Sequence, residues 1–337
     1  MSRKLRWGCL STSGFARKKF IPAFRGCELA EMTAIASRRP DTARQAASEL
    51  GIPKAYGTYE ELLADPEIDV IYNPLPNHLH CEWTIKAVEA GKHVLCEKPA
   101  ALNTGELRKM MAARDRRGVK AGEAFMIRTH PQWLRARELA QSDAIGDLRA
   151  VTGFFSFFNR DPANIRNIPE AGGGALYDIG CYPINGSRFL FGEEPRRVAG
   201  LIERDPGTGV DRLTSAILDF PSGQSIWTVS TQLSGYQRMH AIGTRGRIEI
   251  EIPFNAPNDR PALLFADPTG DPTGAGVCRE EFPVCDQYTI EVDAFSRAIL
   301  EDREVPVPLE DALRNMAVIE AVFRAAESGR WEEVSVR

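Results

Sequence analysis

The sequence predicts an α/β fold for the first part of the chain and an α+β fold for the remainder. Strand-like and helix-like segments alternate over about the first 120 residues, which is typical of a parallel sheet with helices on both faces. Strand-like segments then follow one another from Val198 to Ile252, which indicates an antiparallel sheet with one covered face. The chain has 337 residues, enough for two domains of about 100–200 residues each. We expect a first domain over residues 1–124 and a second over residues 125–337.

The first domain is predicted to contain five strands separated by helices. Gly51, Gly91 and Gly118 each follow a helical pattern, and glycine readily adopts the left-handed conformation of a helix end. The strands are expected at Leu5–Leu10, Met32–Ser37, Val70–Asn73, His93–Cys96 and, as a strand or a hinge, Lys120–Met126. The helices are expected to begin within Ser13–Phe24 and to cover Asp41–Leu50, Tyr59–Ala64, Leu79–Ala90 and Thr104–Arg117.

The second domain is predicted to combine four helices with an antiparallel sheet. The helices are expected at Trp133–Gln141, Leu176–Phe191, Gln287–Glu301 and Leu309–Ser328. The strands are expected at Leu148–Phe157, Arg212–Asp219, Gln224–Gln232, Met239–Gly243 and Arg247–Glu251. The stretch Pro253–Gly276 is rich in proline and glycine, so we expect a long loop or an edge excursion there.

Charge and composition argue against several classes of protein. A net charge of -4 and a pI of about 5.9 do not suit binding to nucleic acid or to an anionic membrane surface. No stretch of about 18 apolar residues is present, and the opening MSRKLRWGCL lacks the apolar core of a secretory signal. The seven cysteines form no CxxC pair, which favours free thiols in a reducing compartment. We therefore expect a cytoplasmic protein.

The turn after the first strand indicates a dinucleotide-binding site of the Rossmann type. Such a site needs a strand, a tight small-residue turn and a helix whose N-terminus faces the pyrophosphate. The usual GxGxxG/A pattern would have glycines at positions 11 and 13, where this chain has serines. Serine is small and its hydroxyl can donate to phosphate. We expect cofactor contacts from the turn residues Ser11, Thr12, Ser13, Gly14, Phe15 and Ala16.

The end of the second strand favours NADP over NAD as the cofactor. An acidic residue at this place would bind the ribose 2′-hydroxyl of NAD, and none is present. The chain instead has Ser37, Arg38 and Arg39, and arginine suits a 2′-phosphate through charge-assisted hydrogen bonds. The alternative is that both arginines are solvated loop residues.

Polar residues also follow the third and fourth strands, where open α/β sheets bind ligands. Further cofactor contacts are expected from Asn73, Pro74, Leu75, Asn77, His78, Glu97 and Lys98. Pro99 is expected to make a sharp bend beside Lys98, with a cis peptide as one way to do so. His78 and His80 have no third ligand nearby in the sequence, so we expect no metal site.

Taken together, these motifs resemble the Gfo/Idh/MocA oxidoreductases. The resemblance covers nearly the whole chain and rests on the Glu97-Lys98-Pro99 motif together with the segment 172–183, GGGALYDIGCYP. It implies a Rossmann domain followed by a domain built on a large open, mostly antiparallel sheet. It also implies a homodimer or homotetramer. The tyrosine at position 182 is similar to that of the subgroup containing glucose–fructose oxidoreductase, dimeric dihydrodiol dehydrogenase and NADP-dependent xylose dehydrogenases.

The resemblance implies hydride transfer between a nicotinamide cofactor and a hydroxyl or carbonyl of a sugar, polyol or cyclic diol. Tyr182 is expected to accept or donate the proton, with Lys98 as its electrostatic partner and Asp178 as a supporting substrate ligand. Asp178 and Tyr182 are four residues apart in a helical stretch, so they share a face. Weaker substrate candidates are Arg128, Arg160, Asn164 and Arg166.

Two other functions stay open at this point. One is an NAD-dependent glycosidase that oxidises its substrate transiently, and the other is a non-catalytic NADP-sensing regulator. Fold and function are separable, so the family fold does not decide among them. The sequence names neither the substrate nor the physiological direction of the reaction.

Overall fold

The computed structural model describes residues 4–336 and divides into two compact units. The first unit contains the chain up to Thr129 together with Asp286–Leu313. The second contains His130–Cys285 and the chain from Arg314 onward. The expected division after residue 124 remains a prediction about the extent of the cofactor domain.

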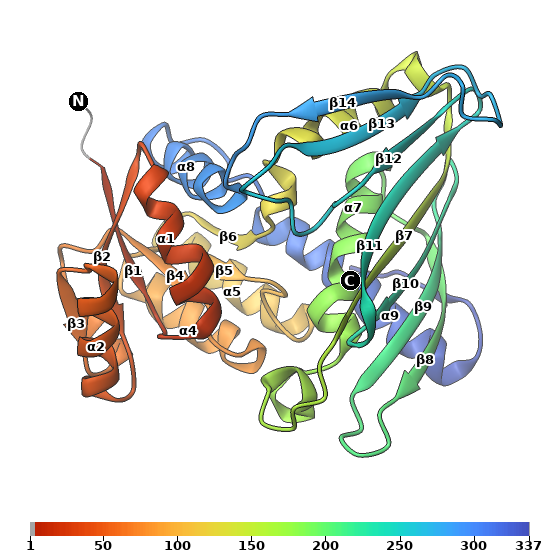
Figure 1. Cartoon of the computed structure of the whole chain (residues 1–337). Helices are drawn as coiled ribbons and strands as arrows, with labels where there is room; N and C mark the ends of the chain where they lie inside the picture. The colour runs from red at the N-terminus through yellow and green to blue at the C-terminus, as the bar shows by residue number, and fades with distance from the viewer. Residues whose placement is uncertain (1–3, 337) are drawn as a thin grey trace. The chain divides into compact units, whose positions relative to one another are not determined.

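The first unit is built on a parallel six-stranded sheet (Figure 1). Its strands are β1 (Leu5–Cys9), β2 (Ala30–Ala36), β3 (Lys54–Tyr56), β4 (Val70–Asn73), β5 (His93–Glu97) and β6 (Ala121–Ala124). Its helices include α1 (Ile21–Ala23), α2 (Pro40–Leu50), α3 (Tyr59–Ala64), α4 (Asn77–Glu89), α5 (Thr104–Arg117) and α8 (Gln287–Leu300). The strand order is β3-β2-β1-β4-β5-β6, so the order reverses between β1 and β4. Ligands of such sheets bind beyond the carboxyl ends of the strands at this reversal.

The segment Asp286–Leu313 joins the first unit through long-range packing. Phe295 of α8 is buried edge-on against Trp7 of β1, with ring centroids 5.8 Å apart. The carboxylate of Asp293 accepts hydrogen bonds from the amides of Glu28 and Leu29 at 2.9 and 3.0 Å. These contacts explain why a helix from late in the chain completes the first unit.

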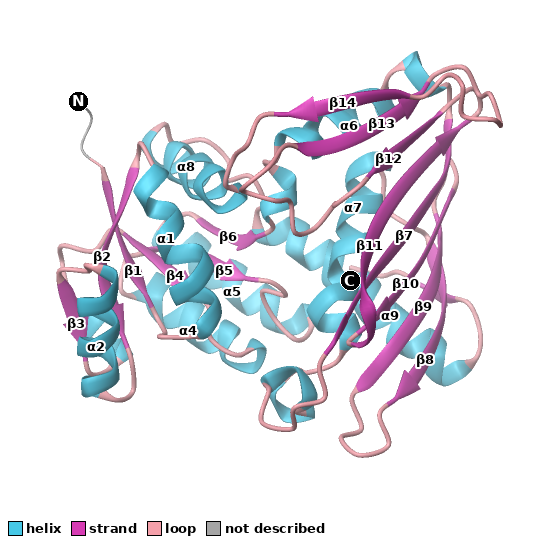
Figure 2. Cartoon of the chain, in the orientation of Figure 1, coloured by secondary structure: helices cyan, strands magenta, loops and turns pink. Residues whose placement is uncertain are grey.

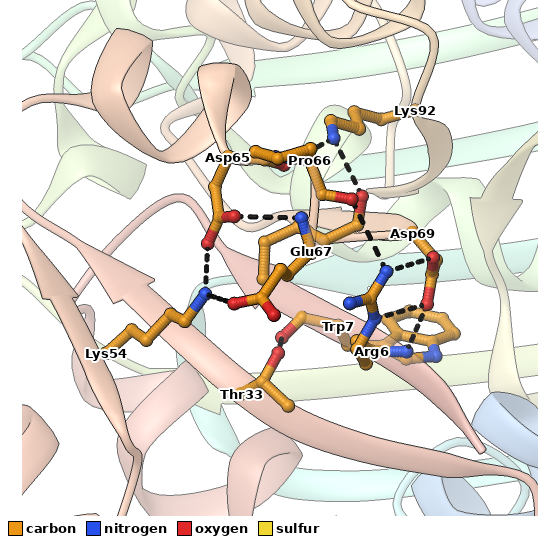
Figure 3. Close-up of polar contacts among 10 residues, drawn as sticks. Arg6, Trp7, Thr33, Lys54, Asp65, Pro66, Glu67, Asp69 and Lys92 are labelled. Atoms are coloured by element: carbon orange, nitrogen blue, oxygen red, sulfur yellow. Dashed lines mark hydrogen bonds and ion pairs between the residues drawn. The ribbon is translucent and has the colours of Figure 1, made fainter. Parts of the chain in front are cut away.

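A polar network links strands of the parallel sheet to the segment that precedes β4 (Figure 3). Arg6 of β1 donates to both oxygens of Asp69, from Nε at 3.0 Å and from a terminal nitrogen at 2.9 Å. The buried Lys92 donates to the carbonyl oxygens of Asp65 and Ile68 at 2.6 and 2.8 Å. This network therefore holds the segment 65–69, which leads into the amino end of β4. Ligands of such sheets bind at the opposite, carboxyl end of the strands.

The second unit is built on a nine-stranded, mostly antiparallel sheet (Figure 2). Its strands are β7 (Leu148–Phe158), β8 (Arg197–Arg204), β9 (Asp211–Asp219), β10 (Gln224–Ser230), β11 (Gln232–Gly243), β12 (Arg247–Ile250), β13 (Ala262–Asp267), β14 (Cys278–Phe282) and β15 (Glu332–Glu333). Its helices include α6 (Pro131–Gln141) and α7 (Cys181–Phe191), while α9 (Leu309–Ser328) begins in the first unit and continues into the second. The order is β14-β13-β12-β11-β7-β10-β9-β8-β15, and among the described strands of this sheet only β7 and β10 pair in parallel. The predicted fold class is confirmed.

Some element predictions are wrong in detail. Lys54–Tyr56 forms β3, which the sequence pattern missed because three half-buried residues carry little periodicity. Within the stretch predicted as a loop or edge excursion, Ala262–Asp267 forms β13 and pairs with both β12 and β14. The segments predicted separately at Gln224–Gln232 and Met239–Gly243 differ too, because one long strand, β11, runs over Gln232–Gly243. No helix among the described residues is long and apolar enough to cross a membrane.

Candidate active site

Two serine hydroxyl groups of the turn after β1 accept hydrogen bonds from backbone amides of the same segment. The hydroxyl oxygen of Ser11 accepts from the amide of Ser13 at 3.0 Å, and that of Ser13 accepts from the amide of Ala16 at 3.2 Å. The helix begins at Gly14, where a Cβ atom would meet nothing within 4 Å, and Ala16 is fully buried. No acidic side chain lies in the first turn after Ala16. The described contacts use the amides of Ser13, Ala16 and Arg17 within the turn, which leaves the amides of Gly14 and Phe15 to face an anion, as a pyrophosphate site requires.

The loop after β2 offers cations and no carboxylate. Arg38 and Arg39 are exposed, and the Ser37 hydroxyl accepts from the amide of Arg39 at 3.3 Å. Burial raises the pKa of Tyr59, and a hydrogen bond from Arg38 opposes that shift. The guanidinium of Arg38 thus lies close to the hydroxyl of Tyr59 in α3, with Arg39 next to it in the chain.

The loop after β4 is held by Asn73 and His80. The amide group of Asn73 donates to the carbonyl of His80 at 3.2 Å and to the hydroxyl of Thr84 at 3.1 Å. Asn73 is fully buried and therefore positions the loop. Pro74 and Leu75 are buried as well, whereas Asn77 and His78 lie in the first turn of α4, with His78 exposed.

His80 was not predicted as a site residue, yet it connects two loops of the candidate site. Its Nε2 lies 2.6 Å from the carbonyl oxygen of Leu75, and its Nδ1 lies 2.8 Å from that of Pro99. Burial lowers the pKa of His80 to about 4, although the contacts with the carbonyl groups of Pro99 and Leu75 oppose that shift. The available sequence signal was its position seven residues after Asn73, which ends a predicted strand. Its structural role is evident only from the tertiary contact with Pro99.

The end of β5 brings Glu97 and Lys98 to the carboxyl edge of the sheet. The hydroxyl of Tyr72 donates to Oε1 of Glu97 at 2.5 Å, a contact that the sequence did not indicate. The Tyr72 ring is stacked on Phe20, with centroids 3.5 Å apart. Glu97 and Lys98 are half-buried, and the Lys98–Pro99 peptide is cis, which confirms the predicted bend.

In the second unit, the glycine run before Tyr182 is explained by close backbone packing. A Cβ atom at Gly173 would lie 2.6 Å from the carbonyl oxygen of Arg166. One at Gly174 would lie 1.9 Å from Oδ1 of Asp211, and Gly174 has a φ of +114°. Asp211 is buried and accepts from the amide of Leu176 at 2.6 Å, at the start of the helical segment. The run therefore leaves room for the carbonyl group of Arg166 and the carboxylate of Asp211, which both accept hydrogen bonds from this segment.

Asp178 and Tyr182 lie on that segment, where a π-helical turn at Leu176–Gly180 leads into α7. A carboxylate oxygen of Asp178 lies 2.7 Å from Nε of Arg166, so these two predicted site residues form an ion pair. Tyr182 is buried, and its ring lies 5.8 Å from Phe155 and 5.2 Å from Phe254, centroid to centroid. The structure thus places Arg166 against Asp178, and Asp178 and Tyr182 four residues apart on one helical segment of the second unit.

The remaining substrate candidates have local partners. Arg128 belongs to the first unit and pairs with the buried Asp311 at 3.0 Å. Arg160 is exposed and 4.0 Å from Asp205. Asn164 accepts from the amide of Arg166 at 3.1 Å and so starts the short helix that carries that arginine. Among the residues that the structure describes, no group of three or more His, Cys, Asp or Glu is arranged to hold a metal ion.

Comparison with models of protein families shows which family the chain belongs to. A model described as "Oxidoreductase family, NAD-binding Rossmann fold" matches residues 6–125, and one described as "GFO/IDH/MocA C-terminal domain" matches residues 133–249. The chain belongs to the Gfo/Idh/MocA oxidoreductase family. It therefore has the nicotinamide-dinucleotide-binding Rossmann domain of these enzymes.

Relatives in the Gfo/Idh/MocA family include enzymes named for sugar chemistry. D-xylose 1-dehydrogenase (NADP(+)) 2 of Haloferax volcanii is 39% identical over 98% of this chain and 100% of its own length. The aldose-aldose oxidoreductase of Caulobacter crescentus, solved with glycerol, has a TM-score of 0.90 and 30% identity over 98% of this chain and 100% of its own. A 3-ketoreductase of Actinomadura kijaniata, solved with NADP and TDP-benzene, has a TM-score of 0.88 and 28% identity over 96% of this chain and 98% of its own.

Proposed function

We propose that this chain is an NADP-dependent oxidoreductase that transfers hydride between its cofactor and a hydroxyl or carbonyl carbon of a sugar, polyol or cyclic diol. The observation that carries the proposal is the placement of Asp178 and Tyr182 on one helical segment, with Arg166 holding Asp178. A buried tyrosine four residues from a positioned carboxylate on the same helical segment suits recognition of a hydroxylated substrate. The names of the relatives, which include a xylose dehydrogenase and an aldose-aldose oxidoreductase, support this substrate class.

NADP is supported as the cofactor by the loop after β2, which has Arg38 and Arg39 and no carboxylate. The xylose dehydrogenase is named for NADP, and the ketoreductase was solved with it. The proposed cofactor contacts are Ser11, Thr12, Ser13, Gly14, Phe15, Ala16, Ser37, Arg38, Arg39, Asn73, Pro74, Leu75, Asn77, His78, Glu97 and Lys98. Of these, Asn73 would act by positioning the loop, because its amide is used within the protein.

In the proposed mechanism, Tyr182 moves the proton that accompanies hydride transfer. The bound nicotinamide supplies or accepts the hydride. A tyrosine hydroxyl ordinarily loses its proton near pH 10, so proton transfer near neutral pH requires a cationic neighbour. We assign that role to Lys98 and assign the orientation of the substrate hydroxyl to Asp178. In the ketoreductase, a tyrosine and a lysine were also the residues chosen for substitution.

The outer face of the nine-stranded sheet supports a homodimer or homotetramer. Ile226 of β10 is paired with Ile217 of β9, and both are exposed. Leu201 of β8 and Tyr236 of β11 are exposed by 74% and 52%. Exposed apolar residues on one sheet face are typical of a protein–protein contact. We propose that a second copy of the chain covers this face.

The function is tested by following the absorbance of reduced nicotinamide with NADP or NAD and a panel of aldoses, inositols and cyclic diols. We expect reduction of NADP with one substrate class, and loss of about 10²–10⁴-fold in kcat with Tyr182→Phe. Tyr56→Phe is the matched control, because this tyrosine lies in β3, donates to Asp65 at 2.6 Å and is not one of the proposed site residues.

Other outcomes of that experiment would contradict the proposal. Tight cofactor binding with no turnover of any substrate would favour the NADP-sensing regulator. Cleavage of a glycoside without net change in the cofactor would favour the glycosidase with transient internal oxidation.

A further inference from the structure

Cys285 lies beside a buried histidine that the proposed reaction does not use. Its Sγ is 3.5 Å from Nε2 of His130. His130 is fully buried, whereas Cys285 is half-buried. Both residues belong to the second unit, and each stands where the chain passes from one unit to the other. An imidazole in contact with a thiol can stabilise its thiolate form, which an isolated cysteine does not gain.

The contacts of His130 determine which ring nitrogen carries its proton. Nδ1 accepts a hydrogen bond from the amide of Gln132 at 3.3 Å, as the cap of α6. Burial lowers the pKa of His130 to about 4, so the ring carries a single proton near pH 7. Because Nδ1 is the acceptor, that proton lies on Nε2 and faces the sulfur of Cys285.

A hydrogen bond donated to sulfur stabilises the thiolate more than the thiol. The carboxylate of Asp286, next in the chain, opposes the thiolate, but it accepts from the amide of Tyr288 at 2.9 Å, at the start of α8. The thiolate is the nucleophilic form of cysteine.

Five of the six other cysteines can be compared with Cys285 by their surroundings. Burial raises the pKa of Cys27 to about 12 and that of Cys81 to about 11. Burial also raises the pKa values of Cys9 and Cys96 far above the ordinary range. Cys278 is exposed, and its Sγ contacts the carbonyl oxygen of Gly276 at 3.8 Å. Cys278 is therefore a comparison thiol with greater access and no imidazole contact among the contacts described.

We propose that Cys285 is an oxidation site, a nucleophilic thiol that His130 activates for reaction with hydrogen peroxide. The thiolate sulfur attacks one peroxide oxygen, a sulfur–oxygen bond forms, and the oxygen–oxygen bond breaks. The leaving hydroxide takes up a proton to become water. The sulfur loses two electrons and becomes a sulfenic acid, while the peroxide is reduced. This inference is independent of the proposed dehydrogenase function.

The test uses the full chain and measures alkylation by iodoacetamide near pH 7, peptide by peptide, by mass spectrometry. We expect Cys285 to react about tenfold faster than the more exposed Cys278, because the hydrogen bond from His130 favours the thiolate form of Cys285. With dilute hydrogen peroxide, we expect a gain of about 16 Da on Cys285, and none at that mass in Cys285→Ser.

His130→Asn is the matched variant, because asparagine also caps helices and so retains the acceptor for the Gln132 amide. We expect the alkylation rate of Cys285 in this variant to fall to that of Cys278 or below. The wild-type comparison needs no variant and stands if His130→Asn does not fold. Faster reaction at Cys278 in the wild type, or an unchanged rate at Cys285 in a folded His130→Asn protein, would overturn the proposal.

Discussion

Gly174 lies so close to Asp211 that a Cβ atom at residue 174 would stand 1.9 Å from Oδ1 of Asp211. The same carboxylate accepts from the amide of Leu176 at 2.6 Å and from the hydroxyl of Thr214 at 3.0 Å. The glycine therefore makes room for a buried acid that caps the segment leading to Tyr182. Replacing either residue tests how strongly this arrangement holds the candidate site.

Gly174→Ala is expected to destabilise the second unit by about 3 kcal/mol or more, because the new methyl group meets Asp211 and φ is positive. Urea unfolding followed by circular dichroism measures the loss. Gly209→Ala is the control, since Gly209 also has a positive φ, of +78°, but has nothing within 4 Å of its Cβ position. It should cost about 1 kcal/mol. Equal losses in both variants would mean that the contact with Asp211 is unimportant.

Asp211→Asn is expected to have an effect on stability that depends on pH. Burial raises the pKa of Asp211 to about 6, although hydrogen bonds from Leu176 and Thr214 lower it. The folded state thus holds this proton more tightly than the unfolded chain, whose aspartate pKa is about 3.9. The resulting stability is fully present below about pH 4 and is lost as pH rises through 6.

The free energy of unfolding of the wild type, relative to Asp211→Asn, should therefore be greater at pH 5 than at pH 7.5. Chemical denaturation at both pH values measures this difference. Asparagine does not titrate, so the comparison removes the contributions of other groups. A difference that stays constant with pH would contradict the assignment of a raised pKa to this residue.

The Arg166–Asp178 pair is expected to act as one element in substrate binding. Arg166→Gln and Asp178→Asn should each lower kcat/KM, and the double variant should lose less than the sum of the two in free energy. A coupling of about 1 kcal/mol, or about fivefold in rate, is expected for neighbours in contact. Arg197→Gln is the control, because Arg197 forms an ion pair of 2.9 Å with Asp219 elsewhere in the unit. Additive losses of free energy in the double variant would show that Arg166 and Asp178 act independently, which would contradict the prediction.

Removing Arg38 and Arg39 together is expected to weaken NADP binding selectively. Each hydrogen bond to a charged group contributes about 1.5–3 kcal/mol, so Arg38→Ala with Arg39→Ala should raise the Kd for NADP by about tenfold or more. The Kd for NAD, which lacks the 2′-phosphate, should change little. Tryptophan fluorescence titration measures both constants. Arg44→Ala in α2 is the control, and equal weakening of NADP and NAD would argue against a 2′-phosphate contact.

The alternation of elements in the first unit could be predicted because its signals are local. The helices α5 and α9 have the bounds expected from periodicity and from the glycines that follow them. β13 was missed because its six residues lie between turn-rich stretches, and their strand state depends on pairing with β12 and β14. Strand pairing of this kind is non-local, and a single short segment does not reveal it.

Candidate residues could be named from the sequence because motifs at strand ends and in glycine-rich turns are defined by residue type and local spacing. Lys98, Asp178, Tyr182 and the serine turn are all visible in this way. What each side chain contacts was decided only by tertiary structure. Examples are the contact between His80 and Pro99, the pairing of Arg166 with Asp178, and the placement of Asp211 against Gly174. These partners are brought together by the packing of segments that are distant in the sequence. That packing is stabilised by the whole core, so no short stretch of sequence determines it.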